Sequence, residues 1–277
     1  MKHLAIFAGF NQDNILTDDT FFYISELSKF YDVIVVFDNA LNNNDLVKLN
    51  EICLTVIAKR HGLYDFGSYK IGIDYAKKNI NIEEYSSILI ANDSVFMVGK
   101  DIKKVVNQYN PNGNIDFWGV YYNTMERYLG GDYHPHIQSY FVIFGSKIIR
   151  SKSFYEFFDA IKKEKSKIDI INKYEIGMTK FFLKRGFTCS SLITRNRNDT
   201  VSTRSLFLLL KGFPFLKKSA FKENIIVRLI GYYVVYINSP EVIRKAILIN
   251  NKKISKIEVL KISVTRIIKK VRSKICI

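Results

Sequence analysis

The chain has 277 residues, of which 48% are hydrophobic and 14% aromatic, enough to bury a core of domain size. Its formal net charge of +16 invites a nucleic-acid partner, but residues 1–200 hold 25 Lys and Arg against 23 Asp and Glu. Residues 201–277 hold 17 basic residues against 3 acidic ones, so the nearly neutral main part of the chain has no general electrostatic attraction for nucleic acid, and we do not expect a nucleic-acid partner for it.

Three cysteines, Cys53, Cys189 and Cys276, are far apart and odd in number, which indicates a reducing compartment rather than a disulfide framework. The N-terminal apolar run meets Gly9 too early for a signal peptide, and no stretch has the length of a transmembrane helix. We therefore expect a cytoplasmic protein, acting at the inner face of the cytoplasmic membrane if its basic region binds lipid.

Apolar runs alternate with amphipathic stretches in the first hundred residues. Buried strands are predicted over residues 3–10, 33–37, 54–58 and 88–91, each bounded by turn-forming or polar residues. Helices are predicted between strands, over 17–30 with a polar N-terminal cap and over 68–78 after a glycine-containing loop. This alternation predicts an α/β fold in which helices cover both faces of a mostly parallel sheet.

Two further strands, over 116–122 and 136–144, and two helices, over 153–161 and 174–185, complete the predicted main domain, which we end at residue 205. The segment between the two strands is rich in Gly, Pro and polar residues, which predicts a loop near the site. Residues 206–277 are predicted to form a basic, largely helical extension. Within it, apolar residues recur at helical spacing among Lys and Arg over 252–277, which fits either an anionic membrane surface or packing on the core.

Small or polar residues follow several predicted strands. Gly9, Asp38 and the triplet Asn92-Asp93-Ser94 stand in this place. In an open α/β sheet, ligands bind outside the carboxyl ends of the strands, so these residues predict a site there, with Asp93 as its first candidate for chemistry. The alternative is that the triplet simply forms a turn or caps the next segment.

Five segments follow one another in a specific order, and they read GLYDFGSYKIG, ILIANDSVF, DFWGVYYN, HIQSYFVIF and YEIGMTKFFLKRGF. Together they resemble the rhamnan synthesis F protein family, bacterial glycosyltransferases of polysaccharide assembly, and GFPFLKKSAF resembles that family's C-terminal region. The resemblance covers about residues 1–222. More distantly, the order of parts is similar to the inverting glycosyltransferases with a GT-A fold.

The resemblance implies a GT-A-like (Rossmann-like) catalytic domain that takes a nucleoside-diphosphate sugar as donor. The acceptor would be a growing cell-surface polysaccharide or a lipid-linked glycan, and the family's name suggests rhamnose as the sugar transferred. A different class of function is a non-catalytic module with the same fold that binds a glycan or a nucleotide sugar.

Glycosyl transfer needs a group that takes the proton from the acceptor hydroxyl, and a carboxylate is the usual choice. Glu175 lies at the predicted N-terminus of the helix over 174–185, in a place similar to the superfamily's helix-start base. We therefore predict that Glu175 is the catalytic base. The helix dipole alone also favours an acidic residue in a first helical turn.

The leaving nucleoside diphosphate needs stabilisation, which Mg²⁺ or Mn²⁺ supplies by bridging phosphate oxygens and protein carboxylates. Asp93 is the predicted metal ligand. The turn offers this single carboxylate, since Asn92 and Ser94 contribute only neutral oxygens, so the sequence leaves metal dependence open.

The remaining donor-side candidates are Gly9, Asp38, Gly62 and Asp65, together with the triplet. The resemblance places Asp38 near the nucleobase. Asp65 would bind the ribose or the sugar, or else cap the loop that contains Gly62.

His136 and Gln138 are predicted to contact the phosphates or sugar hydroxyls. His136 alternatively completes a metal site or is structural, since a lone histidine is a weak metal signal. Trp118 and Tyr140 are the acceptor-binding candidates, because an aromatic ring stacks well on a sugar face, although aromatic residues in apolar strands are by default core.

Overall fold

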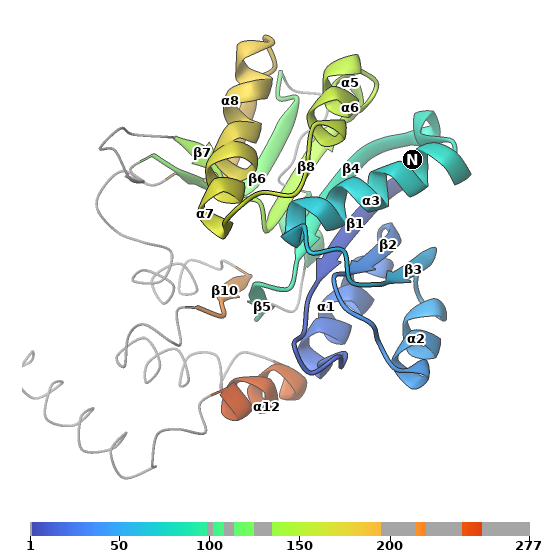
Figure 1. The fold of residues 1–277 in the computed structure, drawn as a ribbon. Coiled ribbons are helices and arrows are strands. Elements are labelled where there is room, and N and C mark those ends of the chain that lie inside the picture. Colours follow the sequence, from blue (N-terminus) through green and yellow to red (C-terminus); the bar gives the residue numbers. More distant parts are fainter. Residues whose placement is uncertain are drawn as a thin grey trace, which may run out of the picture. The chain divides into compact units, whose positions relative to one another are not determined.

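The computed structural model describes residues 2–98, 102–107, 114–124, 135–194, 214–219 and 240–250 (Figure 1). The chain divides into two compact units, one formed by residues 1–93 and 101–198, the other by 94–100 and 199–277. The domain boundary predicted at residue 205 and the basic segment 252–277 lie outside the described residues.

The first unit is built on four parallel strands in the order β3-β2-β1-β4. They are β1 (Lys2–Gly9), β2 (Asp32–Phe37), β3 (Thr55–Ala58) and β4 (Tyr85–Asn92). After their polar first residues, β1 and β2 are unbroken apolar runs that are buried throughout, as expected of strands whose two faces are both covered. The four predicted strands are confirmed to within three residues at each end.

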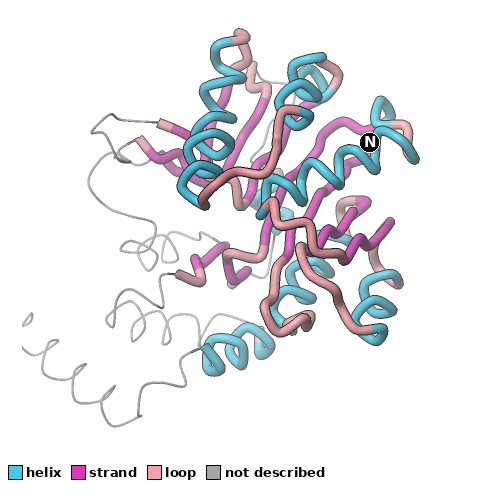
Figure 2. Tube along the Cα trace, in the orientation of Figure 1, coloured by secondary structure: helices cyan, strands magenta, loops and turns pink. Residues whose placement is uncertain are grey.

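Three helices connect these strands, α1 (Asp18–Ser28), α2 (Asn43–Asn50) and α3 (Tyr64–Asn79). Successive β1 side chains point to opposite faces. On one face the Phe7 ring meets the Tyr23 ring of α1 edge-on at 5.3 Å. On the other, a Cβ at Gly72 of α3 would lie 2.4 Å from Ile6, so only glycine lets α3 approach this closely. Helices therefore cover both faces of the sheet, as predicted (Figures 1 and 2).

The other half of the sheet is mixed. It contains β6 (Phe117–Asn123), β7 (His136–Ile137), β8 (Phe141–Gly145) and β9 (Cys189–Thr194). β8 lies antiparallel between β4 and β6, and β9 pairs in parallel with β6. Since β6 and β9 run in the same direction as β1 to β4, the mostly parallel sheet is confirmed, with β7 and β8 running against it.

β7 and β8 are two parts of one interrupted strand. Both pair with β6 on the edge that β9 does not occupy. Tyr122 pairs with Ile137 and Gly119 with Val142, so β6 advances by fewer residues than its partner between these pairs. The strand predicted over 136–144 is thus present, but it is broken by a β-bulge at residues 138–140. Such bulges re-aim side chains and are common beside active sites.

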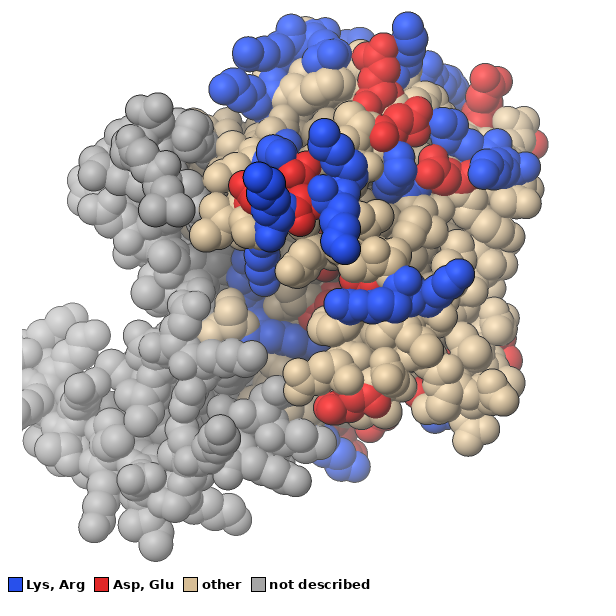
Figure 3. Space-filling view, viewed as in Figure 1, with Lys and Arg blue, Asp and Glu red and all other residues tan. Residues whose placement is uncertain are grey.

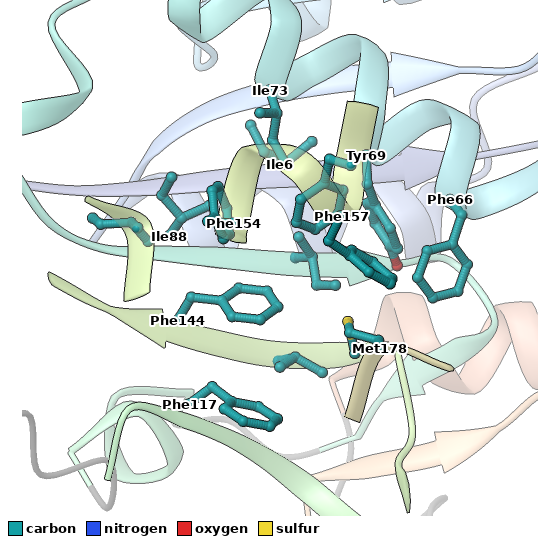
Figure 4. Close-up of a cluster of buried hydrophobic side chains, with 14 of the residues drawn as sticks. Ile6, Phe66, Tyr69, Ile73, Ile88, Phe117, Phe144, Phe154, Phe157 and Met178 are labelled. Carbon is teal, nitrogen blue, oxygen red and sulfur yellow. The ribbon is translucent and has the colours of Figure 1, made fainter. Parts of the chain in front are cut away.

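An aromatic core packs further helices of the first unit on this half of the sheet. They are α5 (Ser146–Ile149), α6 (Lys152–Asp159), α7 (Lys167–Ile170) and α8 (Gly177–Lys184). The short helix α4 (Ile102–Val106) also belongs to the first unit. The Phe144 ring of β8 lies 5.3 Å from Phe154 and 5.7 Å from Phe182 (Figure 4 shows the core around Phe144). Burying each such ring contributes roughly 2–3 kcal/mol, so α6 and α8 are held firmly on the sheet.

The surface of the described residues carries both signs of charge. On the face seen in Figure 3, acidic side chains lie among the basic ones. This agrees with the near balance of charge in residues 1–200.

In the second unit, β5 (Val95–Met97) and β10 (Phe215–Lys217) form an antiparallel pair, and α12 covers Glu241–Asn250. Among the described parts of the chain, no helix has the length and hydropathy needed to cross a membrane.

Candidate functional site

The carboxyl ends of β1, β2 and β4 meet at one edge of the sheet, as predicted. The Asp38 N–H donates to the Gly9 carbonyl at 2.9 Å, and the Asp93 N–H donates to the Ala8 carbonyl at 3.2 Å. The Asp93 carboxylate in turn accepts the Phe10 N–H on Oδ2 at 3.0 Å. Asp93, which is half-buried, is therefore fixed against the end of β1 at the centre of the edge.

Asp38 holds the loop that precedes α3. Its side chain is buried, and its Oδ1 accepts the N–H groups of His61 and Gly62, both at 2.7 Å. Gly62 has a φ of +70°, a conformation that favours glycine. Arg60 donates to the Asp38 carbonyl at 2.9 Å, and its guanidinium lies over the exposed Phe10 ring, 5.1 Å from the ring centroid. The cation and the aromatic ring thus lie at the same edge as the two carboxylates.

Asp65 and Asn92 are joined directly. The Asn92 side-chain amide nitrogen donates to Asp65 Oδ2 at 3.0 Å, and Asn92 itself is buried. Asp65 lies in the first turn of α3, and Tyr69 one turn later is fully buried. Burial, reinforced by the Asp65 charge, raises the pKa of Tyr69 well above its usual value, so this phenol stays protonated.

The bulge at residues 138–140 supplies hydrogen-bonding groups that regular β pairing would have used. The Tyr69 hydroxyl donates to the Ser139 carbonyl at 3.0 Å, and the Asn92 N–H donates to the Tyr140 carbonyl at 3.4 Å. Gln138 is 7% exposed, and its Oε1 has no hydrogen-bond partner among the described residues.

Glu175 faces this bulge. Its Oε1 accepts the Ser139 N–H at 3.0 Å and the Ser139 hydroxyl at 3.1 Å. The prediction that Glu175 starts a helix is wrong, because α7 runs through a π-helical segment (Ile171–Ile176) into α8 without a break. A π-helical turn widens the helix locally and is frequent at functional sites. Glu175 is therefore aimed at the site from within a continuous helix.

The other predicted residues lie deeper. His136 is 1% exposed and pairs with Asn123 across β6 and β7. Trp118 and Tyr140 are 3% and 2% exposed, and the Trp118 ring packs edge-on against Phe141. Their contact with an acceptor stays a prediction.

Ser94 begins the second unit, where its carbonyl accepts the Lys218 N–H at 2.9 Å. Its part in donor binding stays a prediction.

The residues around Asp93 fit a metal ion only in part. Among the described residues, no three His, Cys, Asp or Glu side chains gather as a metal site would require. Near Asp93, the Asn92 amide nitrogen is directed to Asp65. Mg²⁺ is often held by one or two carboxylates plus substrate phosphates, and Asp93 suits that arrangement better than a site built from protein ligands alone.

Sequence reasoning missed Ser139, Tyr69, Phe10 and Arg60. A signal for Ser139 was available, since two polar residues interrupt the apolar pattern of HIQSYFVIF where the bulge forms. Tyr69 carried no comparable signal, because a tyrosine on an amphipathic helix is by default predicted to belong to the hydrophobic core. Phe10 and Arg60 come from segments separated in sequence and meet only in the fold.

Two curated relatives match the chain. The uncharacterized protein y4gN of Sinorhizobium fredii is 32% identical over 168 residues, which are 60% of this chain and 42% of that protein. The chain thus spans less than half the length of this relative. The virulence protein VirA of Vibrio anguillarum is 24% identical over 262 residues, with 80% of each chain covered.

Several solved structures are similar at low identity, among them a glycosyltransferase and a cytidylyltransferase. A glycosyltransferase involved in the glycosylation of the major capsid of PBCV-1 has 7% identity and a TM-score of 0.41, covering 78% of this chain and 92% of its own. A cytidylyltransferase of Leptospira borgpetersenii has 15% identity and a TM-score of 0.42, covering 85% and 97%. With both TM-scores below 0.5, neither similarity bears on function.

The five segments singled out in the sequence predicted one family, and a family model tests that prediction. The model described as rhamnan synthesis protein F matches residues 33–275, which is most of the chain. The chain therefore belongs to the rhamnan synthesis protein F family.

Proposed function

We propose that the protein is a glycosyltransferase that moves a sugar from a nucleoside-diphosphate sugar to a hydroxyl of a cell-surface polysaccharide or lipid-linked glycan. Membership of the rhamnan synthesis protein F family supports this activity, and the family's description favours rhamnose as the sugar. The observation that carries the proposal is the placement of Glu175. Its carboxylate is bound to Ser139 of the bulge, and the next bulge residue, Tyr140, is bound to Asn92, which adjoins Asp93.

The proposed reaction is a direct displacement with inversion. The acceptor hydroxyl oxygen forms a bond to the anomeric carbon, while the bond from that carbon to the diphosphate oxygen breaks and its electron pair leaves with the diphosphate. Glu175 takes the hydroxyl proton as the new bond forms. General-base catalysis of this kind contributes about 10²–10⁴-fold to a rate.

Asp93 is proposed to act at the diphosphate. A Mg²⁺ or Mn²⁺ ion shared by Asp93 and the phosphates would supply positive charge against the leaving group. The chain itself places Arg60 at the same edge, with most of its side chain exposed. An ion held largely by substrate would bind weakly to the protein alone, so the metal requirement should appear only with the donor present.

The test is release of nucleoside diphosphate from a panel of nucleotide sugars, with and without EDTA. The wild type is compared with Glu175→Gln and Asp93→Ala, and with Glu156→Gln, at an exposed position of α6, as the control. We expect one donor to be consumed, and both site variants to fail while the control matches the wild type. Donor binding measured by thermal shift, with no turnover even when a glycan acceptor is supplied, would favour the non-catalytic binding module instead.

A further inference from the structure

Ser139 makes an unusual contact with Glu175. Both of its donors, the backbone N–H at 3.0 Å and the hydroxyl at 3.1 Å, bond to the same carboxylate oxygen, Oε1. Ser139 is 5% exposed, so these bonds are shielded from water and are stronger than at a surface. Within the described part of the chain, nothing hydrogen-bonds to Oε2. The two oxygens of one carboxylate therefore have different surroundings.

Ser139 is itself held on both sides. Its carbonyl accepts the Tyr69 hydroxyl of α3 at 3.0 Å. Two residues earlier, the Ile137 N–H donates to the Thr179 hydroxyl at 3.0 Å. Glu175 and Thr179 are four residues apart and lie on the same side of their helix. One helix face thus binds both the bulge, at Ser139, and the end of β7, at Ile137, which fixes Ser139 relative to Glu175.

We infer that Ser139 is a positioning residue, which anchors Oε1 of Glu175 and leaves Oε2 as the oxygen that takes the acceptor proton. This inference rests on the proposed function. The proton passes from the acceptor hydroxyl to Oε2, and the carboxylate becomes a carboxylic acid.

Among the described groups around Glu175, Ser139 is the one that hydrogen-bonds to its carboxylate. Tyr69 of α3 and Tyr140 of the bulge face it, and burial raises the pKa of both phenols well above the usual value, so both stay neutral. Asp65 lies beyond Tyr69 and is bonded to Asn92. On the same helix, Lys173 is paired with Glu164. No described cation is bonded to the Glu175 carboxylate.

The first test needs no substrate. Protein labelled with carbon-13 at the glutamate side-chain carboxyl is observed by NMR at one fixed pH, and Glu175→Gln identifies the Glu175 signal. Ser139→Ala removes the hydroxyl donor to Oε1, so we expect the Glu175 carboxyl signal to move away from its wild-type position. Ser139→Thr keeps a hydroxyl and should return the signal toward that of the wild type. An unchanged Glu175 signal in Ser139→Ala overturns the inference.

The second test follows transfer. Ser139→Ala should lower kcat about tenfold and leave the donor KM unchanged. If Glu175→Gln is fully active, the proposed base is wrong whatever Ser139 does. If Glu175→Gln is inactive while Ser139→Ala keeps the wild-type kcat, the positioning role alone is wrong.

A variant that leaves Ser139 intact guards against misfolding of Ser139→Ala. Tyr69→Phe removes only the hydroxyl that holds the Ser139 carbonyl. We expect changes in the same direction as for Ser139→Ala, and smaller, in both the Glu175 carboxyl signal and kcat. A Tyr69→Phe protein with wild-type values for both, together with an unfolded Ser139→Ala, would make Ser139 structural only.

Discussion

The side-chain amide of Asn92, at the end of β4, donates to the carboxylate of Asp65, at the start of α3, across 3.0 Å. This bond ties the centre of the sheet edge to the helix that carries Tyr69. It also explains why residue 92, next to Asp93, is an asparagine. An aspartate there would give the turn a second carboxylate but could not donate this hydrogen bond to Asp65.

Replacing Asn92 by Asp should destabilise the protein. The new carboxylate would be buried against Asp65, and because like charges and burial both raise its pKa, its charged form is disfavoured in the folded state. We expect a loss of about 1–3 kcal/mol in the free energy of unfolding at pH 7, recovered as the pH falls and the new group takes up a proton. Urea unfolding at pH 7 and pH 5 measures this.

Asp65→Asn in the Asn92→Asp background is the matched control, since it restores one donor and one carboxylate. Stability should return to near that of the wild type. An Asn92→Asp protein that is as stable as the wild type at pH 7 would show that the two side chains are not in contact.

Removing the Asp38 side chain should loosen the loop before α3. Asp38→Ala leaves the half-buried N–H groups of His61 and Gly62 without their acceptor, at a cost of about 2–4 kcal/mol. Asp38→Asn keeps an acceptor oxygen and should lose less. Unfolding in urea ranks the three proteins, and a ranking with Ala equal to the wild type contradicts the anchoring role.

Two glycines at the site should respond differently to alanine. A Cβ at Gly9 would lie 2.6 Å from the Phe37 ring, so Gly9→Ala must displace a buried ring and should cost about 1–3 kcal/mol. Gly62 has open space around it but a φ of +70°, so Gly62→Ala should cost about 1–2 kcal/mol through backbone strain alone. Thermal unfolding gives both values.

A smaller side chain at Phe37 distinguishes the steric clash at Gly9 from the backbone strain at Gly62. Phe37→Leu should recover part of the stability lost in Gly9→Ala and none of that lost in Gly62→Ala. Equal effects of Phe37→Leu on both variants would argue against a steric role for Gly9.

His61 should make the protein less stable in mild acid. Burial lowers the pKa of His61, and its Nδ1 accepts the Leu63 N–H at 3.1 Å, as only a neutral ring can do. The 3.6 Å approach of this nitrogen to Asp38 is therefore not an ion pair. The unfolded chain takes up the proton first, so the stability that His61 contributes is full above about pH 6.5 and is lost as the pH falls below it.

His61→Gln should flatten that loss. The free energy of unfolding is compared between pH 7.5 and pH 5 for the wild type and the variant. His3, whose pKa burial also lowers, stays in both proteins, so the difference between the two curves belongs to His61. Parallel curves would contradict the assignment.

The strands of the parallel half could be predicted because each is a short apolar run that ends in a turn former. Two helix starts could not. α3 begins at Tyr64, four residues earlier than predicted. Tyr64 has a φ of +58°, and nothing in the sequence predicts this conformation for a tyrosine. Glu175 looked like a first-turn acid, but the segment before it continues the helix in π form, a change of winding with no residue signature.

Strand β9 and helix α2 are among the elements that were not predicted from the sequence. β9, over Cys189–Thr194, was missed because a half-exposed edge strand needs no apolar run. α2, over Asn43–Asn50, was missed because its asparagines favour turns, although Asn42 caps it by accepting the Asp45 N–H at 2.9 Å. The candidate site was found only as a set of strand ends, since the contacts that join its residues are long-range.

The number of extra residues in the bulge between β7 and β8 decides to which face of the sheet the β8 side chains point. Ile137 and Val142 are five residues apart, whereas the β6 residues that pair with them, Tyr122 and Gly119, are three residues apart. The bulged strand therefore contains two extra residues. Since side chains alternate with a period of two, an even excess returns Phe141 to Gly145 to the faces that an unbroken strand would have given them. A deletion of two residues from the bulge would leave each β8 side chain on its present face of the sheet, whereas a deletion of one would turn each of them to the opposite face.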